Sequence, residues 1–356
     1  MKRVLVAPLD WGLGHASRCV PIVGALLQKG CTVIIAGNGR SLELLKLEFP
    51  RLQFEMLPAY DPKYPARGSM VLKMIKQIPK FLAVIRDEHL VVEQLVEKYK
   101  IDVVIADNRY GCWSTKARSV FITHQSNIMM PQKFGWLSGV IRRLNNKLIR
   151  RFSYCWIPDF AGEKSLAGAL ADVQHFDAGM AVRHIGVLSR FKKSSPAPKK
   201  YDLLCVFSGP EPQRSVLETM VVAQLKDHSF SVAIVRGIPR GEPKKTLLVN
   251  ADVFDMLNTG QLQQLIDHSE LVLARSGFST VMDLARLRKK AIFIPTPGQT
   301  EQEYLAKRLR SMKIAYSVQQ PEFDLRAALR DADTFKGFAD LPEESTLLER
   351  ALTEIL

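Results

Sequence analysis

The residue types best suited to chemistry gather where a short apolar run, Leu271–Ala274, gives way to polar residues and glycine. The run is typical of a buried parallel strand, and the segment after it is typical of a helix start. Glycine lets a ligand approach the backbone, and a helix start offers N–H donors, so this junction suits a diphosphate. The expected donors are Arg275, Ser276, Gly277, Ser279 and Thr280, with Ser279 and Thr280 also the candidate N-caps.

A second junction follows directly along the chain. A strand is predicted at Ala291–Pro295, and a helix at Gln299–Arg310 with acidic residues early and basic residues late. An ordinary strand–turn–helix would explain the first junction alone, but two adjacent junctions favour a ligand site at one edge of a sheet. Asp283 lies one helical turn beyond Thr280, where its carboxylate can accept from ribose hydroxyls.

Together these residues resemble the donor-binding segment of GT-B glycosyltransferases, and most of all family 28. That type adds N-acetylglucosamine to the lipid-linked peptidoglycan precursor. The resemblance rests on Arg275-Ser276-Gly277, Thr280, Asp283, Pro295 and Gln302-Glu303. It implies an α/β fold of two Rossmann-like parallel-sheet domains facing each other across a cleft. It also implies that Asp283 holds the ribose and that Gln302 and Glu303 hold the donor sugar. Aspartate here replaces the usual glutamate, and Glu303 replaces a second glutamine.

Another glycine loop follows the first predicted strand, Arg3–Pro8. Gly12 and Gly14 stand between this strand and a predicted helix, which indicates a turn that binds phosphate or sugar. His15 is a candidate general base, although a histidine at a helix start can also be only structural. Arg18 either binds phosphate or is solvated. The loop resembles the Gly-x-Gly-His-x-x-Arg loop of several nucleotide-sugar enzymes.

Two more predicted strands, Ile101–Ala106 and Val120–Thr123, should end at the same cleft. Asp107 follows the first strand and is the alternative base, with a loop cap as its ordinary role. The segment after the second strand resembles the family's His-x-Gln-Asn segment. That resemblance assigns the acceptor side to His124, Gln125 and Asn127.

The domain boundaries follow from composition and from the resemblance. Residues 1–190 form the acceptor-binding domain, 191–200 a linker, and 201–342 the nucleotide-sugar-binding domain. A terminal helix at 343–356 is expected to pack back on the first domain, as GT-B chains usually do.

Five more donor-site residues are assigned through the resemblance. Arg190 takes the place of an arginine that reaches the diphosphate at the domain junction. Ser208 and Gly209 begin a loop that replaces the family's Gly-Gly-Ser, and its two prolines remove N–H donors. Arg214 is expected to compensate for these lost donors. Asn258 lies where the family reads the uracil.

Composition excludes several classes of protein. A chain of 356 residues with 47% hydrophobic content is typical of a soluble globular protein of two domains. Five scattered cysteines favour core packing in a reducing cytoplasm. No signal peptide and no transmembrane run is predicted. No Asp-x-Asp pair or histidine cluster marks a metal site, so no metal or cofactor is expected, the nucleotide sugar being a substrate.

The net charge of +14 is unevenly spread. Residues 1–160 hold 24 Lys and Arg against 12 Asp and Glu, whereas residues 161–356 hold 26 against 24. An anionic partner is therefore expected on the first half: nucleic acid, anionic lipid or a pyrophosphate-linked substrate. Two segments there, Met70–Arg86 and Phe134–Arg151, interleave apolar and basic residues. Each is either a core helix with a basic outer face or a membrane-surface element.

The preferred interpretation is a glycosyltransferase that is inverting and independent of metal. It would move a sugar from a nucleotide diphosphate, by resemblance UDP, to a glycan or lipid-linked acceptor, in the cytoplasm or on the inner face of the membrane. A UDP-sugar hydrolase or epimerase of the same fold is the first alternative, and a non-enzymatic binder of membrane or nucleic acid is the second. The cleft motifs argue against the second, so no nucleic acid is expected. The oligomeric state stays open.

Overall fold

The computed structural model describes residues 1–62, 70–130, 132–174, 176, 180–193, 197–226, 229–238, 251–342 and 346–356. The chain divides into two compact units: unit 1 comprises Met1–Arg190 and Glu343–Leu356, and unit 2 comprises Phe191–Pro342. The residues predicted as a linker, 191–200, thus fall in unit 2. Their middle part, 194–196, and the strand predicted at Thr246–Val249 lie outside the described residues.

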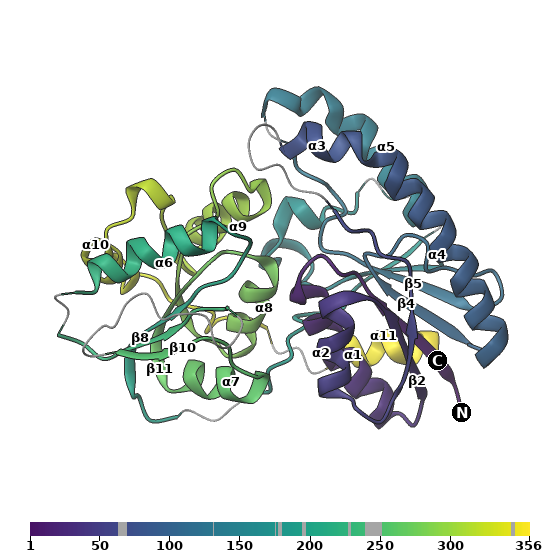
Figure 1. Cartoon of the computed structure of the whole chain (residues 1–356), viewed down its shortest axis with the longest axis horizontal. Coiled ribbons are helices and arrows are strands. Elements are labelled where there is room, and N and C mark those ends of the chain that lie inside the picture. Colours follow the sequence, from purple (N-terminus) through teal and green to yellow (C-terminus); the bar gives the residue numbers. More distant parts are fainter. Residues whose placement is uncertain are drawn as a thin grey trace. The chain divides into compact units, whose positions relative to one another are not determined.

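Unit 1 is built on a parallel sheet with the strand order β3-β2-β1-β4-β5-β6-β7 (Figure 1). Its strands are β1 (Arg3–Pro8), β2 (Thr32–Gly37), β3 (Gln53–Met56), β4 (Val103–Asp107), β5 (Arg118–Ile122), β6 (Tyr154–Ile157) and β7 (Ala181–His184). The central strands are almost wholly buried, which explains why their sequences are continuous apolar runs.

Three helices pack on the main apolar core of this unit: α1 (Leu13–Gln28), α2 (Gly39–Glu48) and α11 (Leu347–Ile355). A second cluster joins α4 (Ile78–Tyr99) to α5 (Ser138–Ile149) through Ile85 and Leu148. The remaining short helices are α3 (Met70–Lys76), η1 (Gln132–Leu137), η2 (Gly162–Lys164) and η3 (Gly168–Ala171). The segment Met70–Arg86 falls in two helices, since α3 ends at Lys76 and Pro79 lies in the first turn of α4, where no N–H is needed.

The terminal helix α11 belongs to unit 1, beside α1 (Figure 1). Its side chains Ala351, Leu352 and Ile355 are buried in the main core. Arg118 Nη1 donates to the carbonyl of Ile355 at 2.8 Å. The helix therefore completes the apolar core that α1 and the strands begin.

Unit 2 contains a second parallel sheet, with the order β10-β9-β8-β11-β12-β13. Its strands are β8 (Tyr201–Val206), β9 (Val232–Val235), β10 (Ala251–Phe254), β11 (Ser269–Ala274), β12 (Lys290–Phe293) and β13 (Tyr316–Ser317). Its helices are α6 (Gln213–Gln224), α7 (Thr259–Asp267), α8 (Phe278–Arg286), α9 (Thr300–Ser311), η4 (Gln320–Glu322) and α10 (Leu325–Ala332). Two Rossmann-like parallel sheets confirm the predicted α/β fold class.

Candidate functional site

The carboxyl edge of the unit 1 sheet brings His15 and Asp107 together. Asp107 is the last residue of β4, which pairs with β1, and His15 lies in the first turn of α1 after β1. His15 Nδ1 is 2.8 Å from Asp107 Oδ1, although the two residues are 92 positions apart. The two predicted rival bases are therefore partners in one pair.

The exposure of the two side chains separates their roles. Asp107 is fully buried, whereas the His15 side chain is 13% exposed. His15 Nδ1 lies 2.8 Å from Asp107 Oδ1 and 2.7 Å from Arg18 Nη2, so it either donates to the carboxylate or accepts from the guanidinium. In the tautomer that donates to Asp107, Nε2 carries the lone pair. Of the two candidate bases, the geometry favours His15, because Asp107 has no exposed surface.

Arg18 completes this group, one helical turn after His15 on α1. It is buried, and its guanidinium donates from Nε and Nη2 to the two oxygens of Asp107, at 3.1 and 2.9 Å. Neither of the roles expected for Arg18, a phosphate contact or a solvated side chain, describes this geometry.

The pKa values follow from this arrangement. Burial alone would raise the pKa of Asp107, but the charges of Arg18 and His15 outweigh it and lower the pKa to about 2. Burial lowers the pKa of His15 below its usual value, and the nearby Arg18 acts in the same direction while Asp107 opposes both. His15 is accordingly a neutral imidazole at neutral pH, the form that accepts a proton.

The loop before His15 is fixed by contacts to α2. The backbone N–H of Ser41 donates to Asp10 Oδ1 at 3.0 Å, and Ser41 Oγ donates to the carbonyl of Leu9 at 3.0 Å. Gly12 is the N-cap of α1 and has a φ of 98°, a conformation that favours glycine. Gly14 lies in the first turn of α1. The glycines therefore shape the turn that presents His15.

Arg109 is a residue that the sequence interpretation missed. It is fully buried, and it donates to the carbonyl of Pro8 at 2.8 Å, to Asn38 at the start of α2, and to the equally buried Glu88 of α4. Glu88 also accepts from the hydroxyl of Tyr60 at 2.9 Å. This pair ties α2 and α4 to the edge of the sheet where His15 lies. Its only signal in the sequence is its place two residues after Asp107.

The predicted acceptor-side residues follow β5 but differ in exposure. His124 is buried and lies close enough to His15 to affect its charge. Gln125 is half-buried. Asn127 is also half-buried, and its side-chain amide donates to the carbonyl of Ala169 at 3.1 Å. Asn127 is therefore engaged in holding the loop that contains η3.

In unit 2, the junction between β11 and α8 differs in detail from the prediction. The N-cap of α8 is Gly277, so Ser279 and Thr280 lie within the first turn and the predicted N-cap positions were wrong. Ser279, Thr280 and Asp283 are all half-buried on the same helix. A Cβ on Gly277 would meet no atom within 4 Å, and its φ is ordinary. The fold itself thus does not require glycine at this position.

The side chains of Arg275 and Ser276 bind backbone carbonyls at this junction. Arg275 is 2% exposed and donates to the carbonyls of Ile294, Pro295 and Gln213 at 2.8–3.1 Å. Ser276 is fully buried and donates to the carbonyl of Gln302 at 2.8 Å. These buried side chains join the β11, β12 and α6 junctions, and their role as diphosphate donors stays a prediction. Burial lowers the pKa of Arg275 to about 10.

Gln302 and Glu303 hold the turn before α9. Gln302 Oε1 accepts from the backbone N–H of Thr296, and Glu303 Oε1 accepts from that of Gly298, both at 2.8 Å. Both side chains are half-buried, so part of each remains accessible. In this structure their acceptor atoms order the backbone of the second junction.

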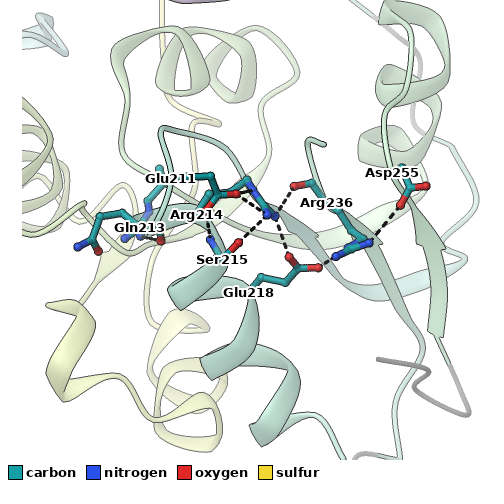
Figure 2. Close-up of polar contacts among 8 residues, drawn as sticks. Glu211, Gln213, Arg214, Ser215, Glu218, Arg236 and Asp255 are labelled. Atoms are coloured by element: carbon teal, nitrogen blue, oxygen red, sulfur yellow. Dashed lines mark hydrogen bonds and ion pairs between the residues drawn. The ribbon is translucent and has the colours of Figure 1, made fainter. Parts of the chain in front are cut away.

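The loop after β8 carries Ser208 and Gly209, both exposed, and leads into α6. Arg214 is buried there in a cluster of charges shown in Figure 2. Its guanidinium contacts Glu211 at 2.6 Å and Glu218 at 2.7 Å, and Arg236 contacts the other oxygen of Glu218. Arg214 thus binds two carboxylates in this structure, and its expected compensation for the lost phosphate donors stays a prediction.

The two remaining predicted residues have simple positions. Asn258 is the N-cap of α7: its side chain accepts from the backbone N–H of Gln261 at 2.9 Å, and Gln261 returns a bond to the backbone N–H of Asn258. Its side chain is therefore a helix cap. Arg190 is half-buried and is the last residue of unit 1 before the chain enters unit 2.

The described residues contain neither a helix that could span a membrane nor a group of side chains that could hold a metal ion. None of the helices there combines the length and apolar composition that a bilayer span requires. No group of three or more His, Cys, Asp or Glu side chains is arranged there to hold a metal ion.

Two Rossmann-like sheets, with polar junctions at their carboxyl edges, define a protein of the GT-B class. Residues 215–344 match the glycosyltransferase family 28 C-terminal domain. Together with the relatives below, this match supports a glycosyltransferase of the family 28 type.

Two curated relatives carry the same description, UDP-N-acetylglucosamine--N-acetylmuramyl-(pentapeptide) pyrophosphoryl-undecaprenol N-acetylglucosamine transferase. The protein from Sulfurihydrogenibium is 22% identical over 93% of this chain and 90% of its own length. The protein from Haemophilus ducreyi is 22% identical over 90% of this chain and 86% of its own length. Similarity therefore extends through both units.

Solved structures support the same fold. MurG of Acinetobacter baumannii superposes with a TM-score of 0.60 at 14% identity, covering 100% of this chain and 99% of that one. The glycosyltransferase SnogD from Streptomyces nogalater gives 0.65 at 14% identity, covering 99% and 100%. These findings do not favour the hydrolase, epimerase or non-enzymatic alternatives.

Proposed function

We propose that the protein transfers a sugar from a nucleotide diphosphate sugar, UDP being the expected nucleotide, to a hydroxyl of a glycan or lipid-linked acceptor. The observation that carries the proposal is the His15–Asp107 pair, in which a half-buried imidazole is oriented by a buried carboxylate. His15 Nε2 takes the proton of the acceptor hydroxyl. The acceptor oxygen then attacks the anomeric carbon, and the bond from that carbon to the phosphate oxygen breaks, with inversion.

The leaving diphosphate requires positive potential from unit 2. The N-cap Gly277 has no side chain to accept from the first turn of α8, so the helix start favours an anion. The buried guanidinium of Arg275, which contacts only carbonyl oxygens among the described residues, adds positive charge two residues before Gly277. In this proposal Arg275 acts through its charge rather than through a hydrogen bond to the phosphate.

Product analysis tests the proposed reaction. The protein is incubated with UDP-sugars, with and without undecaprenyl-linked or soluble glycan acceptors, and UDP and the glycosylated product are quantified. The proposal expects acceptor-dependent UDP release and a product in which the anomeric configuration is inverted. Equal UDP release without any acceptor would instead establish hydrolysis, and a changed sugar configuration in the recovered donor would establish epimerisation.

Asp283→Ala is expected to remove most of the thermal stabilisation that UDP gives. Asp283 lies one turn after Thr280 on α8, where a carboxylate can accept from the ribose hydroxyls. A ligand at about 100 times its dissociation constant stabilises the folded state by ~2.7 kcal/mol, which thermal unfolding detects readily. Asp267→Ala, at the end of α7, is the control. If Asp283→Ala binds UDP as well as the unaltered protein, the donor site lies elsewhere.

Transferase activity is expected to survive EDTA, since the proposal assigns stabilisation of the diphosphate to α8 and Arg275. Initial rates are compared before and after chelation, with magnesium and manganese added back separately. Complete loss on chelation that either metal restores would mean that a bound cation, and not the protein alone, stabilises the leaving group.

A lipid-linked acceptor would require unit 1 to reach a membrane surface, and η1 and α5 have the side chains for it. Three apolar residues at intervals of four, Trp136 in η1 and Val140 and Leu144 in α5, are 76%, 52% and 48% exposed. Arg143, Lys147 and Arg150 are exposed on α5 or just beyond it. We propose that this surface contacts anionic lipid, with the apolar stripe entering the interface and the basic residues on headgroups.

Arg143→Gln with Lys147→Gln is expected to weaken binding to anionic vesicles and to reduce its dependence on salt. Trp136→Ser is expected to weaken binding at all salt concentrations, because it removes apolar contact. Arg326→Gln with Arg330→Gln, two exposed arginines with the same spacing on α10, is the control. Sedimentation with phosphatidylglycerol and phosphatidylcholine vesicles measures both effects. Equal binding to the two vesicle types contradicts the proposal.

A further inference from the structure

The contacts of Arg18 make the His15–Asp107 pair unusual. Arg18 is 3% exposed and contacts both oxygens of Asp107, while its Nη2 also lies 2.7 Å from His15 Nδ1. The spacing of three residues on α1 puts the guanidinium and the imidazole on the same face of the helix. The Asp107 carboxylate thus contacts both the guanidinium of Arg18, which is always charged, and the imidazole of His15, which becomes charged when it binds a proton.

A count of charges shows what this sharing does. In an isolated pair of histidine and aspartate, a proton on the imidazole gives a neutral ion pair, so the carboxylate favours the protonated ring. Here the guanidinium already neutralises Asp107. A proton on His15 would leave a net positive charge in a buried group and would bring an imidazolium within 2.7 Å of a guanidinium nitrogen.

The other titratable groups near His15 do not offset this effect. His124, which follows β5, would add another positive charge if it were protonated. Cys19 follows Arg18 on α1, and burial raises the pKa of its thiol well above the usual value, so it stays neutral. Asp107 is therefore the negative group at His15, and Arg18 occupies both of its oxygens.

We propose that Arg18 keeps the imidazole of His15 neutral, and hence able to accept a proton, in mildly acidic solution. The inference rests on the proposed role of His15 as the base and deepens it. Arg18 is a positioning residue that acts through Asp107 and His15 and does not contact substrate. The base it produces is weaker than a histidine with an unshared carboxylate, but it remains available at lower pH.

The test is a titration of the His15 ring by NMR in the whole protein, with its signals assigned by their loss in His15→Gln. The unaltered protein is expected to titrate below the ordinary histidine value of 6.5. In Arg18→Gln the Asp107 carboxylate no longer pairs with a guanidinium, so the affinity of the His15 ring for a proton should rise by about tenfold or more. Arg18→Lys retains the charge and should titrate close to the unaltered protein. The acidic limb of the pH profile of kcat/KM should move in the same direction as the ring.

Each outcome decides the inference. An unchanged or weaker affinity for the proton in Arg18→Gln overturns it, as does a loss of activity at every pH without movement of the acidic limb. If Arg18→Gln does not fold, a midpoint at or above 6.5 in the unaltered protein overturns it. Failure of the proposed function gives a different result. His15→Gln would then retain full turnover, while the comparison of Arg18→Gln with the unaltered protein would still show the shift in the titration of the His15 ring.

Discussion

His15→Ala is expected to lower turnover by a factor of about 10²–10⁴ and to leave the affinity for UDP unchanged. The imidazole is the half-buried member of its pair and would take the acceptor proton, whereas the residues proposed to bind the nucleotide belong to unit 2. Steady-state kinetics give turnover, and calorimetry with UDP gives affinity. A fall in turnover with unchanged UDP binding separates a chemical role from a binding role.

His89→Gln is the matched control for this prediction. His89 lies on α4 and stacks on Trp113 at a centroid distance of 4.0 Å, away from Asp107 and Arg18. It should retain turnover. Full activity in His15→Ala would show that another group takes the proton and that His15 only begins a helix.

Glu218→Ala is expected to destabilise unit 2 by about 3 kcal/mol, which corresponds to roughly 6–12 °C in its melting temperature. Glu218 bridges Arg214 and Arg236, whose side chains are 6% and 9% exposed (Figure 2). Removing the carboxylate leaves two buried guanidinium groups with less negative charge. We take the low end of the range for a broken buried pair because Glu218 is itself 14% exposed.

Calorimetry of the two unfolding transitions measures this effect, since a chain with two units need not unfold in one step. Glu322→Ala, an exposed acidic residue of η4 in the same unit, is the control. A melting temperature as high in Glu218→Ala as in the control would mean that the cluster contributes no net stability to unit 2.

The fold was predictable because parallel strands buried on both faces leave continuous apolar runs in the sequence. β1 was placed at Arg3–Pro8 with the bounds that it has in the structure. β3 was missed, since Gln53–Met56 lies at the sheet edge with two exposed and two half-buried residues and has no such run. Edge strands depend on their neighbour for stability, and that neighbour is not visible in the local sequence.

The candidate site was predictable by position but not by partner. His15 and Asp107 were both placed at a sheet edge, yet their contact depends on the order of strands β1 and β4, which no local pattern gives. Arg275 was assigned to a ligand as a donor at the junction of a strand and a helix, and Arg214 as compensation for the N–H donors that two prolines remove. Both side chains are buried and bind carboxylates or carbonyls of the protein. The neighbouring residues in the sequence do not distinguish such an arginine from one that binds the anion of a ligand.

The return of α11 to unit 1 has a consequence for how the protein forms during synthesis. All of unit 2 is encoded between Arg190 and Glu343, so it leaves the ribosome before the helix that supplies Leu352 and Ile355 to the core of unit 1. Unit 2 is thus able to fold while the earlier unit still lacks part of its apolar interior. Domains usually fold in order from the amino end to the carboxyl end during synthesis. Here unit 1 can complete its core only after unit 2 has been made. A nascent chain stalled before Leu347 would lack Ala351, Leu352 and Ile355, and the incomplete apolar core of unit 1 would be open to chaperones.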